Sequence, residues 1–417
     1  MNVSTTESTS HPTYEFTLDN GLKIIVREDH RIPKVYSTLM YGVGAVNERP
    51  EDWGLSILLS NVLQDNYWKE VNFLHEPLYD GCFYTSLDYF QLDFPVLREQ
   101  LDTALKCQAH LMNRIPDDEV IRHQLELLIQ KTKGDSAFEE DSGNSPEFEA
   151  LIETGTTRYR PREGITANLE RLTLEQVKQW HKMWYGPNNA VLCVAGDIKV
   201  DEVKRLAEKY FGGLARCDLP DRPIVRGPAE PGYRQTTQHI NTKYPQMLII
   251  FNTPSLVTTT DHQSVRALQV ICELLSKSAP AHLTSVGQNP AYIFASTFRI
   301  SRGASRLRFA YYFEGDADEA ESGFWSLVDA LIQSPLSPAD IEPAIAAVCT
   351  KRQEFNDSLK GQSKTIARLV SNGSPWQLID LDVPKLRELT PADIQRAAKT
   401  FLTRERASVG RSYPVEK

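Results

Sequence analysis

The 417-residue sequence contains no run of about 18 consecutive apolar residues, the length that a membrane-spanning helix requires. Basic residues are also few, because 46 Lys and Arg stand against 55 Asp and Glu, for a net charge of -9. A nucleic-acid binder needs a basic surface to neutralise phosphates, and a polybasic membrane anchor needs a basic cluster. The composition therefore predicts neither a membrane span nor a nucleic-acid partner.

The six cysteines include no Cys-x-x-Cys pair and are scattered over the whole chain. Scattered cysteines in a chain of this length are typical of reduced core thiols rather than of a disulfide framework. Residues 1–16 have no basic start and no apolar segment, unlike a secretory signal, and they contain Glu7 but no Arg, unlike a transit peptide. These features favour a short disordered leader and a cytoplasmic protein, with a periplasmic location as the alternative.

Motifs of several common enzyme classes are missing as well. The sequence has no Gly-x-Ser-x-Gly elbow, no phosphate-binding loop and no two histidines at the spacing of a helical metal site. Gly42-Val43-Gly44 lacks the third glycine of a dinucleotide-binding fingerprint, so we interpret it as a turn. His75-Glu76 and the acidic run Glu139–Asp141 are interpreted as solvated surface segments rather than as metal ligands or a positioned carboxylate pair.

The pattern of apolar residues indicates alternating strands and helices. Asp19-Asn20-Gly21 separates two alternating apolar runs within residues 14–27, which is typical of a hairpin turn. Apolar residues spaced three and four apart predict helices, and short apolar or aromatic runs predict strands. We expect strands at residues 35–41, 83–94 and 190–195, and helices at 53–64, 97–114, 118–133, 173–184 and 199–211.

A weak internal repeat indicates that the chain contains two related halves. Arg171–Val177 resembles Glu388–Ile394, and the threonines in these two segments lie 217 residues apart (390 − 173). At the same offset, Ala190–Leu192 coincides with Ala407–Val409. A helix, a turn and a strand therefore recur in the same order at about half the chain length.

A proline- and glycine-rich segment, residues 217–232, lies between the two copies and has the composition of a linker. We therefore predict two homologous domains, residues 14–216 and residues 233–417. The fold class that these patterns indicate is α+β.

Two groups of segments resemble the pitrilysin/insulinase family of metallopeptidases. The first group is Leu18–Val26 (LDNGLKIIV), Gly42–Gly44 and Asn47-Glu48, and the second is Tyr185–Leu192 (YGPNNAVL) with Gly196-Asp197. The resemblance implies two homologous α+β domains in each chain, each with a mixed, largely antiparallel sheet packed against helices. It also implies that two such chains pair as a clamshell around an enclosed chamber.

In active members of this family, a helix carries the motif HxxEH, in which two histidines bind zinc and the glutamate activates the metal-bound water. Alignment on the resemblance places Ile57 and Asn61 at the two histidine positions and Ser60 at the position of the glutamate. Ile57 has no donor atom, and the hydroxyl of Ser60 is not a base at neutral pH. The resemblance therefore implies that this helix neither binds zinc nor activates water.

A later helix supplies a glutamate as the third zinc ligand in the active family members. The resemblance places Gln124 and Lys131 where this helix has its two glutamates, and the ammonium group of Lys131 would repel a cation. We therefore expect no metal and no other cofactor in this chain, with zinc present only in a partner subunit.

Peptide-binding positions of the family are also altered. Cys82-Phe83, followed by Tyr84, replaces the Asn-Ala pair on the edge strand that binds the substrate backbone by β-augmentation. In the second half, Tyr292 matches a tyrosine that reaches the substrate, whereas the neighbouring arginine of the family is missing. We expect peptide contacts at Cys82, Phe83, Tyr84 and Tyr292.

Together, these features predict a non-catalytic, zinc-free subunit of a heterodimeric zinc metallopeptidase. Its partner would be a catalytic family member that carries HxxEH, and its ligand would be a peptide substrate. Two alternatives remain open. One is a peptide-binding or scaffold homodimer without a protease partner, similar to the core subunits of respiratory complex III. The other is an active enzyme that uses residues outside the known motifs.

Overall fold

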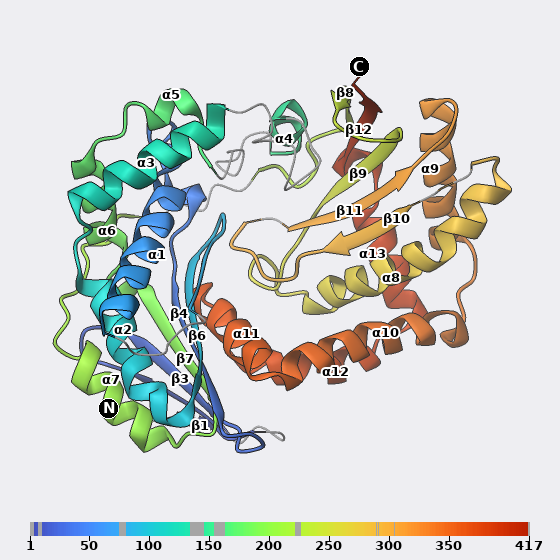
Figure 1. Cartoon of the computed structure of the whole chain (residues 1–417). Coiled ribbons are helices and arrows are strands. Elements are labelled where there is room, and N and C mark those ends of the chain that lie inside the picture. The colour runs from blue at the N-terminus through green and yellow to red at the C-terminus, as the bar shows by residue number, and fades with distance from the viewer. Residues whose placement is uncertain are drawn as a thin grey trace. The chain divides into compact units, whose positions relative to one another are not determined.

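The computed structural model describes most of the chain, and the contacts within it define two compact units (Figure 1). The described residues are 4–6, 11–74, 81–133, 146–153, 163–221, 227–288, 290, 292–303 and 305–415. Unit 1 consists of residues 1–137, 160–223 and 354–380, and unit 2 consists of residues 138–159, 224–353 and 381–417.

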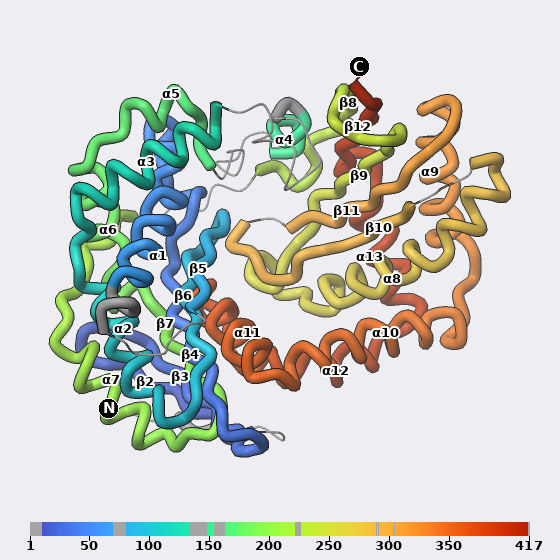
Figure 2. The backbone as a smooth tube through the Cα atoms, viewed as in Figure 1, coloured from blue at the N-terminus to red at the C-terminus, as the bar shows by residue number. Residues whose placement is uncertain are grey.

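The two units are discontinuous in sequence, whereas the domains expected from the sequence, residues 14–216 and 233–417, are continuous. Each unit takes in one segment from the other half of the chain. Helix α11 (Leu359–Ser371) packs against strands of unit 1, and helix α4 (Pro146–Ile152) packs against strands of unit 2. Figure 2 shows α11 in orange-red beside the blue and green strands of unit 1. Residues 222–226 of the expected linker lie outside the described residues.

Unit 1 contains a seven-stranded sheet with the strand order β1-β2-β3-β7-β4-β6-β5. Strands β3 and β7 are parallel, and every other neighbouring pair is antiparallel. The expected hairpin turn joins β2 to β3, and Gly21 there has a φ of 91°, which few residues other than glycine adopt. The strand bounds are β1 Ser4–Thr6, β2 Thr13–Thr17, β3 Lys23–Glu28, β4 Lys34–Tyr41, β5 Cys82–Thr85, β6 Phe90–Leu97 and β7 Ala190–Gly196.

One expected strand, residues 83–94, is in fact a hairpin made of β5 and β6. The chain turns at residues 86–89, where the hydroxyl of Ser86 accepts hydrogen bonds from the backbone N–H groups of Asp88 and Tyr89. Serine favours such turns because its hydroxyl can replace a backbone acceptor. Because residues 83–94 are rich in aromatic side chains throughout, their composition did not indicate this turn.

The main hydrophobic core of unit 1 lies on one face of its sheet, beneath five helices. Alternate residues of β4 show the division, because Leu39 and Tyr41 belong to this core while Thr38 and Met40 contact side chains from the other face. On that other face, α11 packs against β4 and β7. The core helices are α1 Leu55–Leu74, α2 Leu101–Asn113, α3 Asp118–Lys133, α6 Leu174–Trp184 and α7 Val200–Phe211, with the short α5 Thr166–Leu169 beside α3.

Unit 2 contains a five-stranded sheet with the order β10-β11-β9-β12-β8, in which only β8 and β12 are parallel among the described strands. One face packs against α8, α9 and α13, and the opposite face packs against α4. The bounds are β8 Arg234–Ile240, β9 Gln246–Thr253, β10 Ile293–Thr297, β11 Ser305–Tyr312, β12 Ala407–Pro414, α8 His262–Ser285, α9 Ala317–Gln333, α10 Pro338–Asp357, α12 Leu378–Arg387 and α13 Pro391–Phe401.

The repeat expected from the sequence is present in the structure. The order β3-β7-β4-β6-β5 in unit 1 corresponds strand for strand to β8-β12-β9-β11-β10 in unit 2. Thr173 and Thr390 each cap a helix, α6 and α13, in a capping box closed by the side chain three residues later. Both helices are followed by a strand that begins at the predicted offset, at Ala190 and Ala407. The predicted fold class, two homologous α+β domains with mixed sheets, is therefore confirmed.

Candidate functional site

Helix α1 carries three of the four positions that the sequence assigns to a lost metal site. Its N-terminus is fixed by the buried carboxylate of Glu48, which accepts hydrogen bonds from the backbone N–H groups of Gly54 (3.1 Å) and Ser56 (2.6 Å). A carboxylate is favourable there because the first N–H groups of a helix have no partner within the helix. The Asn47-Glu48 segment that the sequence analysis singled out therefore positions α1.

The assigned side chains on α1 do not fit a zinc ion. Ser60 is buried, and Ile57 and Asn61 are partly buried. Zinc sites in proteins are built from thiolate, imidazole and carboxylate groups, none of which these residues have. Ile57 instead packs against the hydrophobic core of unit 1.

The fourth position, Lys131, lies on α3, which packs against α1. Its side chain is 58% exposed, and its Nζ lies 3.7 Å from Oε1 of Glu163. Gln124, on the same helix, is partly buried. An ammonium group brings positive charge and no lone pair, so this helix does not complement a cation. That these residues occupy the metal positions of the family stays a prediction from the alignment.

Other candidate ligands do not gather elsewhere in the described ranges, where no three His, Cys, Asp or Glu side chains lie close enough together to hold a metal ion. His75-Glu76 and Glu139–Asp141 lie outside those ranges, so their interpretation as surface segments stays a prediction. All six cysteines are free thiols. No helix in the described part of the chain is both long and apolar enough to cross a membrane.

Strand β5, which contains the expected peptide contacts of unit 1, forms one edge of the seven-stranded sheet. Cys82 and Tyr84 are exposed, whereas the ring of Phe83 packs 5.4 Å from that of Tyr67 and 6.4 Å from that of Phe90. Within the described residues, β5 pairs only with β6. Its outer backbone groups are thus available to pair with an extended peptide.

Tyr292, the remaining expected contact, belongs to unit 2 and directly precedes the edge strand β10. Its ring is half-exposed and lies 5.5 Å from the ring of Tyr312, which in turn lies 5.7 Å from Tyr244. Phe294 and Phe298 are also exposed along this edge. Sequence reasoning singled out Tyr292 alone, although aromatic residues at positions 292, 294 and 298 were a visible signal.

The comparisons with known proteins agree on one family. Residues 171–348 match the family model described as the peptidase M16 inactive domain. The zinc protease PqqE of Helicobacter pylori is 23% identical over 291 residues, which are 64% of this chain and 62% of that protein. The chain therefore spans less than two thirds of the length of this curated relative.

Solved structures show the same fold. A protease from Helicobacter pylori superposes with a TM-score of 0.85 at 16% identity, covering 96% of this chain and 99% of the other. The first half of the periplasmic protease PqqL from Escherichia coli superposes with a TM-score of 0.80 at 14% identity, covering 99% and 94%. In the structure of the whole PqqL protein, the match covers 99% of this chain but only 48% of the PqqL chain. These findings confirm the family resemblance that the sequence motifs indicated.

Proposed function

We propose that this chain is a member of the M16 (pitrilysin/insulinase) peptidase family and acts as a non-catalytic, zinc-free subunit of a two-chain zinc metallopeptidase. In this role it pairs with a relative that carries HxxEH and completes the chamber in which peptides are cleaved. The observation that carries the proposal is the state of α1, whose anchoring by Glu48 is intact while its assigned metal and base positions hold Ile57, Ser60 and Asn61.

The side chains at the assigned positions support the proposal that this chain has lost catalytic activity. Hydrolysis by this family requires a cation that lowers the pKa of bound water and a base that takes its proton. Ile57 provides no lone pair, Ser60 provides no base, and Lys131 provides a charge of the wrong sign. Four separate substitutions would be needed to recover the site, so no single change restores it.

A match to one half of a longer protease supports the pairing. The chain covers nearly all of the first half of PqqL but only 48% of the whole protein, so PqqL contains about as much chain again. In the proposed complex, the HxxEH-bearing partner supplies the half equivalent to the rest of PqqL. PqqL is described as periplasmic, which supports the periplasmic alternative for this chain over the cytoplasmic one.

The edge strands support a role in peptide binding. An extended peptide that pairs with β5 would satisfy its free backbone groups and lie beside the exposed side chains of Cys82 and Tyr84. The ring of Phe83 points into the core, so its contribution would come from its backbone. In unit 2, Tyr292 and its aromatic neighbours offer rings against which apolar side chains of a peptide can pack.

The test is to mix this chain with an HxxEH-bearing relative from the same source, and to follow complex formation by gel filtration and cleavage of a fluorogenic peptide. We expect a 1:1 complex that cleaves the peptide, and no cleavage by this chain alone. Exchange of the glutamate for glutamine in the partner's HxxEH should abolish cleavage without dissociating the complex. Absence of a complex would contradict the proposal, and a stable peptide-binding homodimer would establish the scaffold alternative in its place.

Variants of this chain separate peptide binding from assembly. Within the complex, Tyr84→Ala and Tyr292→Ala should each raise KM several-fold, because each removes an aromatic contact worth about 1 kcal/mol. Met183→Ala is the matched control, since Met183 is an exposed apolar residue on α6 that belongs to neither edge strand. Equal KM values for all three variants would show that Tyr84 and Tyr292, at the two sheet edges, do not contact the peptide.

A further inference from the structure

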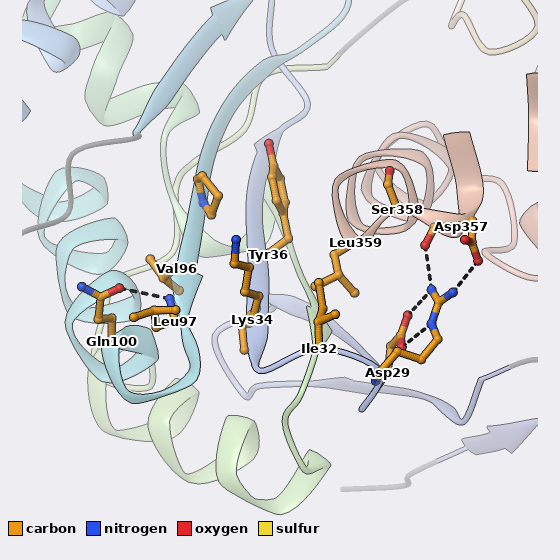
Figure 3. A pocket seen from close by; sticks show the side chains of 13 residues that line it. Asp29, Ile32, Lys34, Tyr36, Val96, Leu97, Gln100, Asp357, Ser358 and Leu359 are labelled. Atoms are coloured by element: carbon orange, nitrogen blue, oxygen red, sulfur yellow. Dashed lines mark hydrogen bonds and ion pairs between the residues drawn. The ribbon is translucent and has the colours of Figure 1, made fainter. Parts of the chain in front are cut away.

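A pocket of about 590 Å³ opens in unit 1, on the face of the sheet that carries α11 (Figure 3). This volume falls in the range of small-molecule sites, about 300–1,000 Å³. Three separate stretches of the chain form it. They are the loop before β4 with the first residues of that strand, the end of β6, and the N-terminal end of α11. Its lining residues are Asp29, Arg31, Ile32, Lys34, Val35, Tyr36, Pro95, Val96, Leu97, Gln100, Asp357, Ser358 and Leu359.

The walls of the pocket are largely apolar and partly open to solvent. Ile32 is 48% exposed and Leu97 is 41% exposed, whereas Leu359 is buried at the start of α11. Figure 3 shows Leu97 on one side of the opening, and Ile32 and Leu359 on the other. Large apolar side chains exposed on both sides of a concave surface offer an apolar ligand a surface to cover.

The charged groups of the pocket are paired, with one exception. Arg31 lies between two carboxylates, with its Nη2 2.7 Å from Oδ2 of Asp29 and its Nη1 2.5 Å from Oδ1 of Asp357. Lys34 is exposed, and its ammonium group has no ion pair or hydrogen bond with any described residue. Figure 3 shows its side chain extending between the Leu97 side and the Leu359 side of the opening.

The pocket is separate from the proposed peptide-binding edge. Strand β5 pairs with β6 only from Phe90 to Asp93, whereas the pocket uses Pro95–Leu97, beyond the end of this pairing. A peptide added to β5 therefore does not account for the exposed apolar walls around Lys34.

We propose that this pocket binds a carboxylate attached to an apolar body, either an aliphatic acid or the free C-terminus of an apolar peptide. The apolar body would cover Ile32, Leu97 and Leu359, and the carboxylate would accept hydrogen bonds from the ammonium group of Lys34. An ion pair beside apolar walls is screened less by water than one on an open surface. A cationic ligand is disfavoured, because Lys34 would repel it and both nearby carboxylates are already paired with Arg31.

The first test measures binding of decanoate and of decan-1-ol to the full-length chain by isothermal titration calorimetry. Decanoate should bind, and decan-1-ol should bind more weakly, because only the acid can pair with Lys34. Lys34→Met keeps the apolar stem of the side chain and removes its charge, and it should weaken decanoate binding about tenfold. Lys106→Met, an exposed lysine on α2, is the matched control and should leave binding unchanged.

A second arm distinguishes the two sources of the carboxylate. A short apolar peptide with a free C-terminus is compared with the same peptide amidated, again with the parent chain and Lys34→Met. Tighter binding of the free peptide than of decanoate identifies a peptide terminus as the ligand, and the reverse order identifies an aliphatic acid. The proposal is overturned if neither carboxylate binds at millimolar concentration, or if Lys34→Met and Ile32→Gln leave binding of both unchanged.

Discussion

The two sheets share one strand order, yet the helices that cover their second faces are held in different ways. In unit 1, the contacts of α11 with β4, β6 and β7 include a buried ion pair and hydrogen bonds beside buried apolar side chains. In unit 2, the contacts of α4 with the sheet include a buried aromatic ring. Each of these helices comes from the other half of the sequence, so the same exchange of segments buries an ion pair in unit 1 and an aromatic ring in unit 2.

A buried ion pair joins α11 to the sheet of unit 1. Nζ of Lys364 on α11 lies 2.7 Å from Oδ2 of the fully buried Asp93, whose Oδ1 accepts a hydrogen bond from the hydroxyl of Thr38 at 2.9 Å. The hydroxyl of Ser363, also on α11, donates to the backbone carbonyl of Cys193 at 2.9 Å. Buried charges tolerate the loss of a partner poorly, because the remaining group has left water without compensation.

Apolar packing dominates in unit 2. The fully buried ring of Phe148 packs against Leu248, Ile250 and Ala310 on the face of the sheet. Gly410 on β12 makes room for this ring, since a Cβ atom there would lie only 2.8 Å from it. Arg306 also forms an ion pair with Glu149 of α4, in which its Nη1 lies 3.3 Å from Oε2.

The largest effect should come from removing the cation in unit 1. Lys364→Met leaves Asp93 buried without its partner and should lower the free energy of unfolding by about 3–5 kcal/mol. Adding Asp93→Asn should recover much of this loss, because no uncompensated charge then remains. Lys360→Met, at an exposed position of the same helix, is the control and should be nearly neutral. Equal denaturation midpoints for Lys364→Met and Lys360→Met would mean that charge does not hold α11.

The corresponding change in unit 2 removes the aromatic ring of Phe148 from the face of the sheet. Phe148→Ala should cost about 3 kcal/mol, from lost apolar burial and the cavity that remains. Gly410→Ala should cost about 1–3 kcal/mol from the opposite side, because the added methyl group overlaps the ring. In the double variant the two costs should not add, since the ring with which the methyl group collides is gone. Strict additivity in chemical denaturation would contradict the packing described here.

The repeat itself provides a second comparison, in which a buried histidine of unit 1 has no histidine at the equivalent position of unit 2. His181 on α6 is buried, and at the offset of 217 its equivalent on α13 is Ala398. Burial lowers the pKa of His181 to about 4 from its ordinary value of 6.5, although a hydrogen bond to the carbonyl of Leu111 opposes the shift.

The folded pKa of His181 lies below the unfolded one, so between these values the unfolded chain binds a proton that the folded chain does not. Its contribution to stability is therefore complete above pH 6.5 and is lost as the pH falls towards 4, by up to about 3 kcal/mol. His181→Gln should flatten this part of the stability profile, whereas Ala398→Ser should leave its slope unchanged. Parallel profiles for the parent chain and His181→Gln between pH 7 and 4 would show that the histidine does not titrate in this way.

The smallest expected effect concerns the two helix caps. Thr173 and Thr390 are both exposed, and each hydroxyl accepts a hydrogen bond from the backbone N–H three residues later. Thr173→Ala and Thr390→Ala should therefore cost about 1 kcal/mol each. Thr→Ser at either position keeps the hydroxyl and should be close to neutral. Unequal losses measured by chemical denaturation would show that the two caps, although similar in geometry, are not equivalent in energy.

Local features of the fold were predictable from the sequence, and features that join distant segments were not. The Asp19–Gly21 turn follows from a few neighbouring residues, and the helix, turn and strand that recur at the offset of 217 follow from short segments, so the sequence indicated both. Nothing near Phe148 indicates that Gly410 makes room for its ring, and nothing near Lys364 indicates that Asp93 is its partner. The reciprocal exchange of α4 and α11 was missed for this reason.

The same distinction applies to the candidate site. Ile57, Ser60 and Asn61 lie within about one turn of a helix, so the sequence alone was enough to predict a loss of metal ligands there. The pocket around Lys34 escaped detection because it is assembled from three segments far apart in the chain. Its signal, a lysine that has no ion-pair partner among the described residues and lies between exposed apolar side chains, exists only after folding.

The central claim is that this chain keeps the architecture of a zinc peptidase without its metal site, and its most direct test is the zinc content of two purified proteins. The first is the isolated chain, and the second carries Ile57→His, Ser60→Glu, Asn61→His and Lys131→Glu together. After dialysis against zinc and then buffer, elemental analysis should find no zinc in the first protein and about one zinc per chain in the second. Stoichiometric zinc in the unaltered chain would contradict the claim, and a folded quadruple variant without zinc would contradict the assigned positions.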